Sequence, residues 1–139
     1  MKCLLDTNAV SEPTRARPDP GYMSWFRIAE QSALFVSVVT LGELRRGAAL
    51  LAEGPRRSRY EAVHMQLIDW FEDRVVSIDR EIALAWGELS AQARMAGRET
   101  AMADQLLAAT AISRDLVLVT RNRRDFEHSG CKLLCPWSA

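Results

Sequence analysis

The sequence predicts an α/β domain with a mostly parallel central sheet of four to five strands, covered by helices on both faces. Short, continuously apolar runs alternate with longer segments in which apolar residues recur at helical spacing. This alternation indicates right-handed βαβ units, because neighbouring parallel strands need a crossover connection. A length of 139 residues suffices to bury a core, and we expect residues 1–139 to form a single domain.

The first half of the chain predicts two strands and three helices. Residues 3–5 form an apolar run typical of a buried parallel strand, and we expect the second strand at residues 35–39. Residues 11–21 carry three prolines, which predicts a loop or a broken turn. Apolar side chains at helical spacing predict helices at residues 22–31, 41–52 and 60–71, with a break at Gly54-Pro55 before the third.

The second half predicts two more helices and up to three strands. A short strand at residues 75–78 precedes Asp79, which is well placed to cap a helix over residues 80–96 that ends at Gly97. The next helix is expected at residues 101–114. Strands are expected at residues 116–119 and 132–135, the last of them stopped by Pro136.

The composition is that of an ordinary globular protein, with 48% apolar and 26% charged residues. The formal net charge of +0 excludes a global basic field, so any contact with nucleic acid depends on local arginine clusters. We take Arg46, Arg121 and Arg123 as candidate nucleic-acid contacts, and a plain solvated surface explains such clusters about as well.

Location can also be anticipated from the sequence. No run approaches the ~20 apolar residues of a membrane helix, and the start of the chain does not resemble a signal peptide. The three cysteines are odd in number and form no CxxC pair, which fits a reducing compartment. We therefore expect a cytoplasmic protein without a membrane partner.

Acidic side chains follow the predicted strands. Asp6 comes directly after the first strand, and Glu43 comes soon after the second. Asp104 opens the helix that leads into residues 116–119, which are followed by Asn122 and Asp125. Because the carboxyl ends of parallel strands meet at one edge of a sheet, these side chains are expected to share a crevice.

Each acid, taken alone, has a structural alternative that stays open. The segment from Thr40 to Glu43 matches a capping box, in which the glutamate satisfies a backbone N–H group. Asp104 lies in the first turn of its helix, where the helix dipole favours an acid. Asp6 or Asn8 is equally suited to cap a turn after the first strand.

The combination favours a metal site. Asp104 is the only charge among small apolar residues, with no lysine or arginine three or four positions away. Two carboxylates ~4 Å apart repel by about 4 kcal/mol at an effective dielectric near 20, so a shared crevice needs a cation or a raised pKa. Sites built only from carboxylates prefer Mg²⁺ or Mn²⁺, which indicates phosphate-ester chemistry. No glycine-rich phosphate loop, Ser/His/Asp pattern or Cys/His pair offers another chemistry.

Four motifs in order carry a resemblance to a known family. They are Leu4-Leu5-Asp6-Thr7-Asn8, Thr40-Leu41-Gly42-Glu43-Leu44, Ala103-Asp104-Gln105-Leu106-Leu107-Ala108-Ala109-Thr110-Ala111 and Val119-Thr120-Arg121-Asn122-Arg123-Arg124-Asp125-Phe126. Together they resemble the PIN-domain ribonucleases, in particular the VapC toxins of bacterial toxin–antitoxin pairs. Ser11-Glu12-Pro13 and Pro136-Trp137 are most similar to the FitB-like subgroup.

This resemblance implies a PIN-like fold and a metal-dependent endoribonuclease with Mg²⁺ or Mn²⁺ as cofactor. The metal-binding acids would be Asp6, Glu43 and Asp104, with Asn122 as a fourth catalytic-site residue. Asp125 would be a supporting acid or a cap of its loop, and Thr7 and Thr120 would hydrogen-bond the metal ligands.

The resemblance further implies an RNA substrate, a cognate antitoxin and a homodimer. Trp25, Phe26, Trp70 and Phe71 would serve such contacts or simply pack in the core. The alternatives are an RNA-processing nuclease of the same fold without a toxin role, and a relative that has lost catalysis and only binds RNA or a partner. A small-molecule phosphatase is a further alternative, but it would be expected to carry a phosphate-cradling loop.

Overall fold

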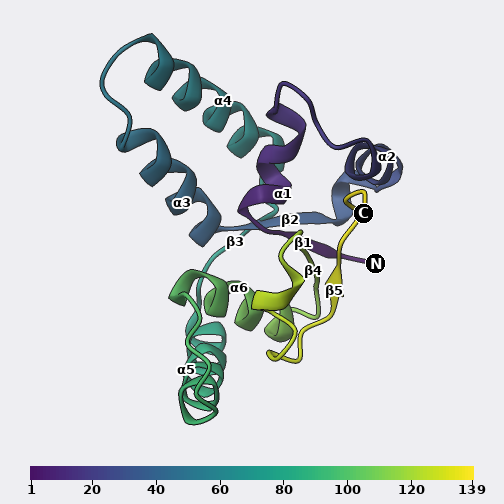
Figure 1. The fold of residues 1–139 in the computed structure, drawn as a ribbon, viewed down its shortest axis with the longest axis vertical. Coiled ribbons are helices and arrows are strands. Elements are labelled where there is room, and N and C mark those ends of the chain that lie inside the picture. Colours follow the sequence, from purple (N-terminus) through teal and green to yellow (C-terminus); the bar gives the residue numbers. More distant parts are fainter.

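A five-stranded, fully parallel sheet in the order β3-β2-β1-β4-β5 forms the centre of the computed structural model, which describes residues 1–139. The strands are β1 (Cys3–Leu5), β2 (Leu34–Ser37), β3 (Val75–Val76), β4 (Val117–Val119) and β5 (Leu133–Leu134). The central strand β1 pairs with β2 and β4, and Leu5 lies opposite both Val36 and Val119. The carboxyl ends of these three strands are therefore level, and the predicted parallel sheet is confirmed (Figure 1).

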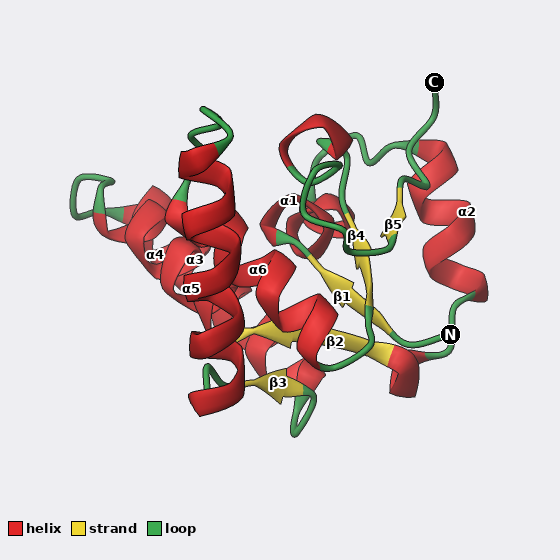
Figure 2. Ribbon diagram, turned by 90° about the horizontal axis from the view of Figure 1, so that it is seen from below, coloured by secondary structure: helices red, strands yellow, loops and turns green.

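Helices cover both faces of this sheet, as the sequence predicted (Figure 2). Cys3 and Leu5 point into one core cluster, together with Tyr22 of α2 (Pro20–Ile28) and Phe71 of α4 (Pro55–Phe71). Leu4, from the same strand, points into the other cluster and meets Leu107 of α6 (Met102–Ser113). Outside α6 lies α5 (Arg80–Met95), which contributes the half-buried Leu89. This alternation along β1 follows from the two-residue period of a strand.

The junction between β2 and the next helix differs from the sequence prediction. The second strand is confirmed, but it ends at Ser37 and α3 (Val38–Ala49) begins at once, so the predicted strand end at residue 39 and the helix start at residue 41 were wrong. Ser37 is the cap, because its Oγ accepts a hydrogen bond of 3.0 Å from the backbone N–H of Val39. The β-branched pair Val38 and Val39 favoured a strand, and the cap overrode that local preference.

The capping box predicted for Thr40 to Glu43 is consequently wrong. Thr40 lies inside the first turns of α3 and is fully buried, while Glu43 lies one turn further along the helix. The position of Glu43 therefore needs another explanation, which the site provides.

The proline-containing segment after β1 is more ordered than a loop. A short helix α1 (Thr7–Ser11) starts directly after Asp6, and the 3-10 turn η1 (Glu12–Thr14) continues it. The remaining helices agree with the prediction apart from shifts at their ends. Gly54 with φ 149° precedes α4, Asp79 caps α5 through the N–H of Ile82, and Gly97 with φ 71° follows α5.

The C-terminal segment packs against α2. It also brings together the two motifs that are most similar to the FitB-like subgroup, Ser11-Glu12-Pro13 and Pro136-Trp137. The indole Nε1 of Trp137 donates a hydrogen bond of 2.6 Å to Oε1 of Glu12, and both side chains are buried. The backbone N–H of Ser138 donates to Oδ2 of Asp19 at 2.9 Å, and the N–H of Gly21 donates to Oγ of Ser138 at 3.1 Å. The end of the chain is thus a structural part of the first core cluster.

The aromatic helical residues belong mainly to the core. Phe71 is buried, and Trp25, Phe26 and Trp70 are partly buried against the first cluster. The rings of Phe26 and Trp70 stack with their centroids 5.8 Å apart. No helix in the structure has both the length and the apolar character needed to span a bilayer.

The close approach of the C-terminal segment to α2 is testable with two glycine substitutions. We expect Gly21→Ala to lower the free energy of unfolding by about 1–3 kcal/mol, because a Cβ atom there would lie 2.9 Å from the backbone N of Ser138 and 3.0 Å from the carbonyl O of Pro136. Urea denaturation measures this. The control Gly47→Ala meets nothing within 4 Å and should raise stability by up to about 1 kcal/mol through its helix propensity. Equal stability of the two variants would contradict the packed position of the tail.

Candidate functional site

Asp6 lies at the carboxyl end of the central strand and is held by backbone groups. Its own N–H donates to the carbonyl O of Val119 on β4 at 3.1 Å, and its Oδ1 accepts from the N–H of Ala9 at 2.8 Å. The residue is only 6% exposed, and this burial raises the pKa of Asp6 above its ordinary value. Hydrogen bonds from Thr120 and Ala9 oppose the rise in pKa, while the charge of Glu43 adds to it. Asp6 is thus both the cap of α1 and a fixed carboxylate at the edge of the sheet.

Glu43 projects from α3 toward α1, where a threonine binds it. The Oγ1 of Thr7 donates a hydrogen bond of 2.6 Å to Oε1 of Glu43 and lies 3.3 Å from Oγ1 of Thr40. The hydroxyl of the residue after Asp6 therefore fixes the orientation of the glutamate. This contact spans two elements far apart in the sequence, so local patterns did not indicate it.

Asp104, in the first turn of α6, experiences the charges of the other acids. Burial is the largest cause that raises the pKa of Asp104 to about 6, followed by the negative charges of Asp125, Glu43 and Asp6. These interactions place carboxylates from β1, α3, α6 and the segment after β4 in one electrostatic environment. The structure therefore brings the three predicted metal-binding acids to the same end of the sheet.

Asn122 and Asp125 form a unit in the segment after β4. The backbone N–H of Asn122 donates to Oγ1 of the buried Thr120 at 3.0 Å, and its side-chain amide donates to Oδ2 of Asp125. Asp125 ends the 3-10 turn η3 (Arg123–Asp125). Thr120 thus contacts both this unit and Asp6, whereas Asn122 and Asp125 are exposed.

The site carries negative charge without a basic partner. The ion pairs of the structure include none of Asp6, Glu43, Asp104 and Asp125. Oxygen-only donors and excess negative charge fit a divalent cation of the Mg²⁺ type. No three acidic, histidine or cysteine side chains are grouped closely enough to hold one ion as they stand. The residues thus fit such an ion by donor type and charge, with the acids spread wider than one coordination shell.

The three arginines that were predicted to contact nucleic acid lie at the surface. Arg46, Arg121 and Arg123 are all exposed. Backbone hydrogen bonds from Tyr22 and Ser138 are the main causes that lower the pKa of Asp19 before α2, and the charge of Arg121 adds to them. Two arginines that sequence reasoning did not single out, Arg98 and Arg124, are among the residues that line a cavity beside the acids. The signal available for Arg124 was its place in the arginine cluster beside Asn122, and Arg98 had none.

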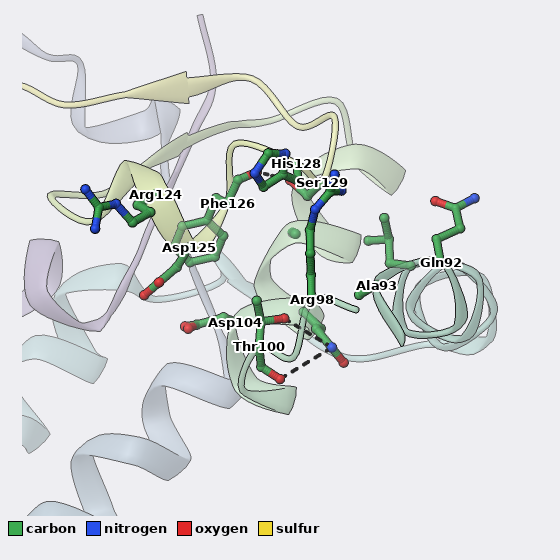
Figure 3. Close-up of a pocket in the computed structure, with 13 residues that line it drawn as sticks. Gln92, Ala93, Arg98, Thr100, Asp104, Arg124, Asp125, Phe126, His128 and Ser129 are labelled. Atoms are coloured by element: carbon green, nitrogen blue, oxygen red, sulfur yellow. Dashed lines mark hydrogen bonds between the residues drawn. The ribbon is translucent and has the colours of Figure 1, made fainter. Parts of the chain in front are cut away.

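A cavity of about 330 Å³ opens beside the acids (Figure 3). Arg98 and Arg124 are among its lining residues, and the guanidinium group of Arg124 points away from Arg98. Asp104 and Asp125 line one end of it. The other lining residues come from α5, from the connection between α5 and α6, and from the segment around Phe126. The acidic site therefore continues into a pocket with positive charge.

The model of the PIN domain matches residues 3–130 of this chain. The chain belongs to the PIN-domain family. The parallel sheet with acids at its carboxyl edge is thus the arrangement of a known nuclease family, and the resemblance based on the four motifs is confirmed.

Two curated relatives indicate to which subgroup of the PIN-domain family this chain belongs. The VapC ribonuclease Y4jK of Sinorhizobium fredii is 31% identical over 135 residues, which cover 96% of this chain and 96% of that protein. Toxin FitB of Neisseria gonorrhoeae is also 31% identical over 135 residues, covering 96% of this chain and 97% of the relative. The chain is therefore a member of the VapC and FitB branch of PIN-domain ribonucleases, whose members are metal-dependent in general.

Solved structures agree with this assignment. The crystal structure of FitAcB from Neisseria gonorrhoeae superposes with a TM-score of 0.88 at 30% identity, covering 99% of both chains. The agreement extends over the whole sheet and its helices, so the predicted PIN-like fold is confirmed.

The raised pKa of Asp104 predicts how the stability of this PIN domain depends on pH without metal. The folded protein binds the Asp104 proton more tightly than the unfolded chain, so its stabilising contribution is complete below about pH 4 and is lost as pH rises through about 6. In EDTA, the wild type should therefore lose stability between these pH values relative to Asp104→Asn. Thermal denaturation from pH 4 to 7 measures the difference.

The exposed carboxylate of Asp69 on α4 provides the control for this experiment. Asp69→Asn should give a pH profile parallel to that of the wild type. Parallel profiles for wild type and Asp104→Asn would contradict the electrostatic coupling of Asp104 to the other acids.

Proposed function

We propose that this PIN-domain protein is an endoribonuclease that hydrolyses RNA phosphodiester bonds with a divalent cation and acts as the toxin of a toxin–antitoxin pair. The observation that supports this most is the group of acids at the carboxyl edge of the sheet, which makes no ion pair. Burial, followed by the negative charges of Asp125, Glu43 and Asp6, raises the pKa of Asp104 in this group to about 6. In a member of a ribonuclease family, such a group is best explained by a cation-dependent phosphodiesterase site.

In this proposal, Asp6, Glu43 and Asp104 hold Mg²⁺ or Mn²⁺. A bound ion of this kind supplies positive charge to the phosphate oxygens and lowers the pKa of a coordinated water. The protein contributes fixed ligands, because Ala9 and Thr120 hydrogen-bond Asp6 and Thr7 hydrogen-bonds Glu43. Restricting ligand rotation in advance lowers the cost of assembling the site.

Asn122 and Asp125 complete the site in different roles. The Asn122 amide is neutral and donates to Asp125, so the pair is suited to orient a water molecule or the RNA. Asp125 also adds negative charge beside Asp104, which strengthens the attraction for a cation. Arg46, Arg121 and Arg123 remain candidates for contacts with the RNA backbone, since all three are exposed.

The partner of a toxin of this type is an antitoxin protein. The solved structures similar to this chain are FitAB and VapBC toxin–antitoxin complexes, which supports the proposal. A second cavity of about 260 Å³ lies between α1, α2 and α4 and is lined mainly by apolar residues, among them Val10, Phe26 and Trp70. In this proposal the cavity binds an apolar part of the antitoxin.

A homodimer, as the family resemblance implies, also belongs to this proposal. The exposed Leu84 and Met95 of α5 and Ile112 of α6 supply apolar surface for it. We propose a cytoplasmic location, because RNA is the substrate and the three free thiols fit a reducing compartment.

Loss of a central acid should abolish both metal binding and cleavage. We expect Asp6→Asn to lower Mn²⁺ affinity and to reduce RNA cleavage by more than about 100-fold, while the fold persists because the amide still caps α1. Calorimetric titration with Mn²⁺ and a gel assay on total RNA measure the two effects. Asp69→Asn, an exposed carboxylate on α4, should match the wild type in both.

The two measurements separate this proposal from its alternatives. Wild-type cleavage rates in Asp6→Asn would refute the assignment of the acids. A wild type that binds no Mn²⁺ and cleaves no RNA would favour a relative that only binds RNA or a partner. Cleavage without growth inhibition on expression would favour an RNA-processing nuclease without a toxin role.

A further inference from the structure

The cavity beside Asp104 and Asp125 extends well beyond the acids. In Figure 3 the two carboxylates lie at one end, Gln92 of α5 lies at the other, and Arg98 lies between them. Because α5, the α5–α6 connection and the segment after β4 all contribute to the lining, the cavity is a feature of the tertiary structure.

Three polar side chains that line this cavity have no partner in the protein, whereas Gln105, Ser129 and His128 are already paired. The guanidinium groups of Arg98 and Arg124 make neither an ion pair nor a hydrogen bond in the structure, although two carboxylates line the same cavity. The side-chain amide of Gln92 likewise makes no hydrogen bond. Unpaired guanidinium groups bind phosphate well, and a free amide can both donate to and accept from the edge of a base.

Apolar side chains form part of the cavity wall. Leu89, Ala93 and Ala108 contribute aliphatic surface, and the buried Phe126 lies near Asp125 (Figure 3). A volume of about 330 Å³ is at the small end of ligand-binding cavities, which suits one nucleotide and excludes a duplex. An unpaired base presents the combination required here, since it has an apolar face and a polar edge.

We propose that this cavity binds one unpaired nucleotide of the RNA next to the scissile phosphate and thereby sets the sequence preference of cleavage. Gln92 reads the edge of the base, which packs against Ala93, and Arg98 binds the phosphate of this nucleotide. This inference rests on the proposed ribonuclease function and adds a subsite to it. The acids carry out hydrolysis at one end, while the cavity selects the neighbouring residue of the substrate at the other.

Two substitutions separate the base contact from the phosphate contact. With a randomised single-stranded RNA pool and Mn²⁺, sequencing of the cleavage products gives the base preference at each position around the cut. Gln92→Ala should flatten the preference at one position next to the cut and retain the overall rate within a few-fold. Arg98→Ala should lower kcat/KM by about tenfold on all sequences and retain the preference, with partial rescue in Arg98→Lys.

Arg94→Ala is the matched control for this cleavage experiment. Arg94 lies in the last turn of α5, is exposed and does not line the cavity, so the variant should match the wild type in rate and in preference. The same RNA pool annealed to its complement should be a poor substrate, because a paired base cannot enter the cavity.

A binding experiment tests the subsite independently of catalysis. The four nucleoside 5′-monophosphates and inorganic phosphate are titrated into the Asp6→Asn protein and followed by NMR. Asp6 does not line the cavity, so this variant removes the proposed activity and leaves the subsite intact. At least one nucleotide should bind more tightly than inorganic phosphate and should lose affinity by about tenfold in the Arg98→Ala, Asp6→Asn double variant.

The outcomes distinguish the two levels of the proposal. Two results would overturn the subsite while the ribonuclease function still holds. One is cleavage by the wild type without any base preference. The other is a base preference and a cleavage rate that stay unchanged in both Gln92→Ala and Arg98→Ala. Absence of cleavage by the wild type counts against the ribonuclease function. In that case nucleotide binding that depends on Arg98 still supports the subsite, and its absence overturns it.

Discussion

Repulsion among carboxylates at the carboxyl edge of a parallel sheet is the constraint on which the rest of this structure depends. Burial, followed by the negative charges of Asp125, Glu43 and Asp6, raises the pKa of Asp104 to about 6, and none of these four acids has a basic partner. A fold optimised only for stability would neutralise such a group. Its persistence in a PIN-domain chain indicates that the charge is reserved for a ligand, and stability is given up locally to keep the site ready.

The scaffold holds these acids by contacts that do not neutralise them. Asp6 is fixed by backbone hydrogen bonds at the start of α1, and Thr7, the next residue, holds Glu43 from α3. The same short helix leads into Glu12, whose buried carboxylate accepts the indole N–H of Trp137 near the end of the chain. The position of Asp6, the first of the proposed metal ligands, is therefore linked through α1 and η1 to the C-terminal segment. The end of the chain thus stabilises the part of the fold that carries the site.

The distribution of charge also separates the two tasks of an RNA-cleaving site. The net charge of the chain is +0, so long-range attraction of RNA is weak and recognition must be local. The acids gather at the ends of β1 and β4, while Arg98 and Arg124 line the cavity that continues from them. Excess negative charge for a cation and free positive charge for phosphate are thus adjacent without neutralising each other, which is the arrangement that a phosphodiester substrate with a metal ion requires.

The sequence by itself determined the parallel α/β fold and the family, and it predicted which acids would lie at the carboxyl edge of the sheet. Continuous apolar strands, helical periodicity and acids after the strands are local signals that can be recognised in the sequence. The acids come together in the fold because parallel strands align their carboxyl ends. Only the tertiary structure decided how the acids are held. It replaced the capping box expected at Thr40 and Glu43 by a cap at Ser37 and a bond from Thr7 to Glu43, and it joined Glu12 to Trp137. It also placed Arg98 in the lining of the cavity beside Asp104 and Asp125, because α5 and the segment after β4 complete that lining only in the folded chain.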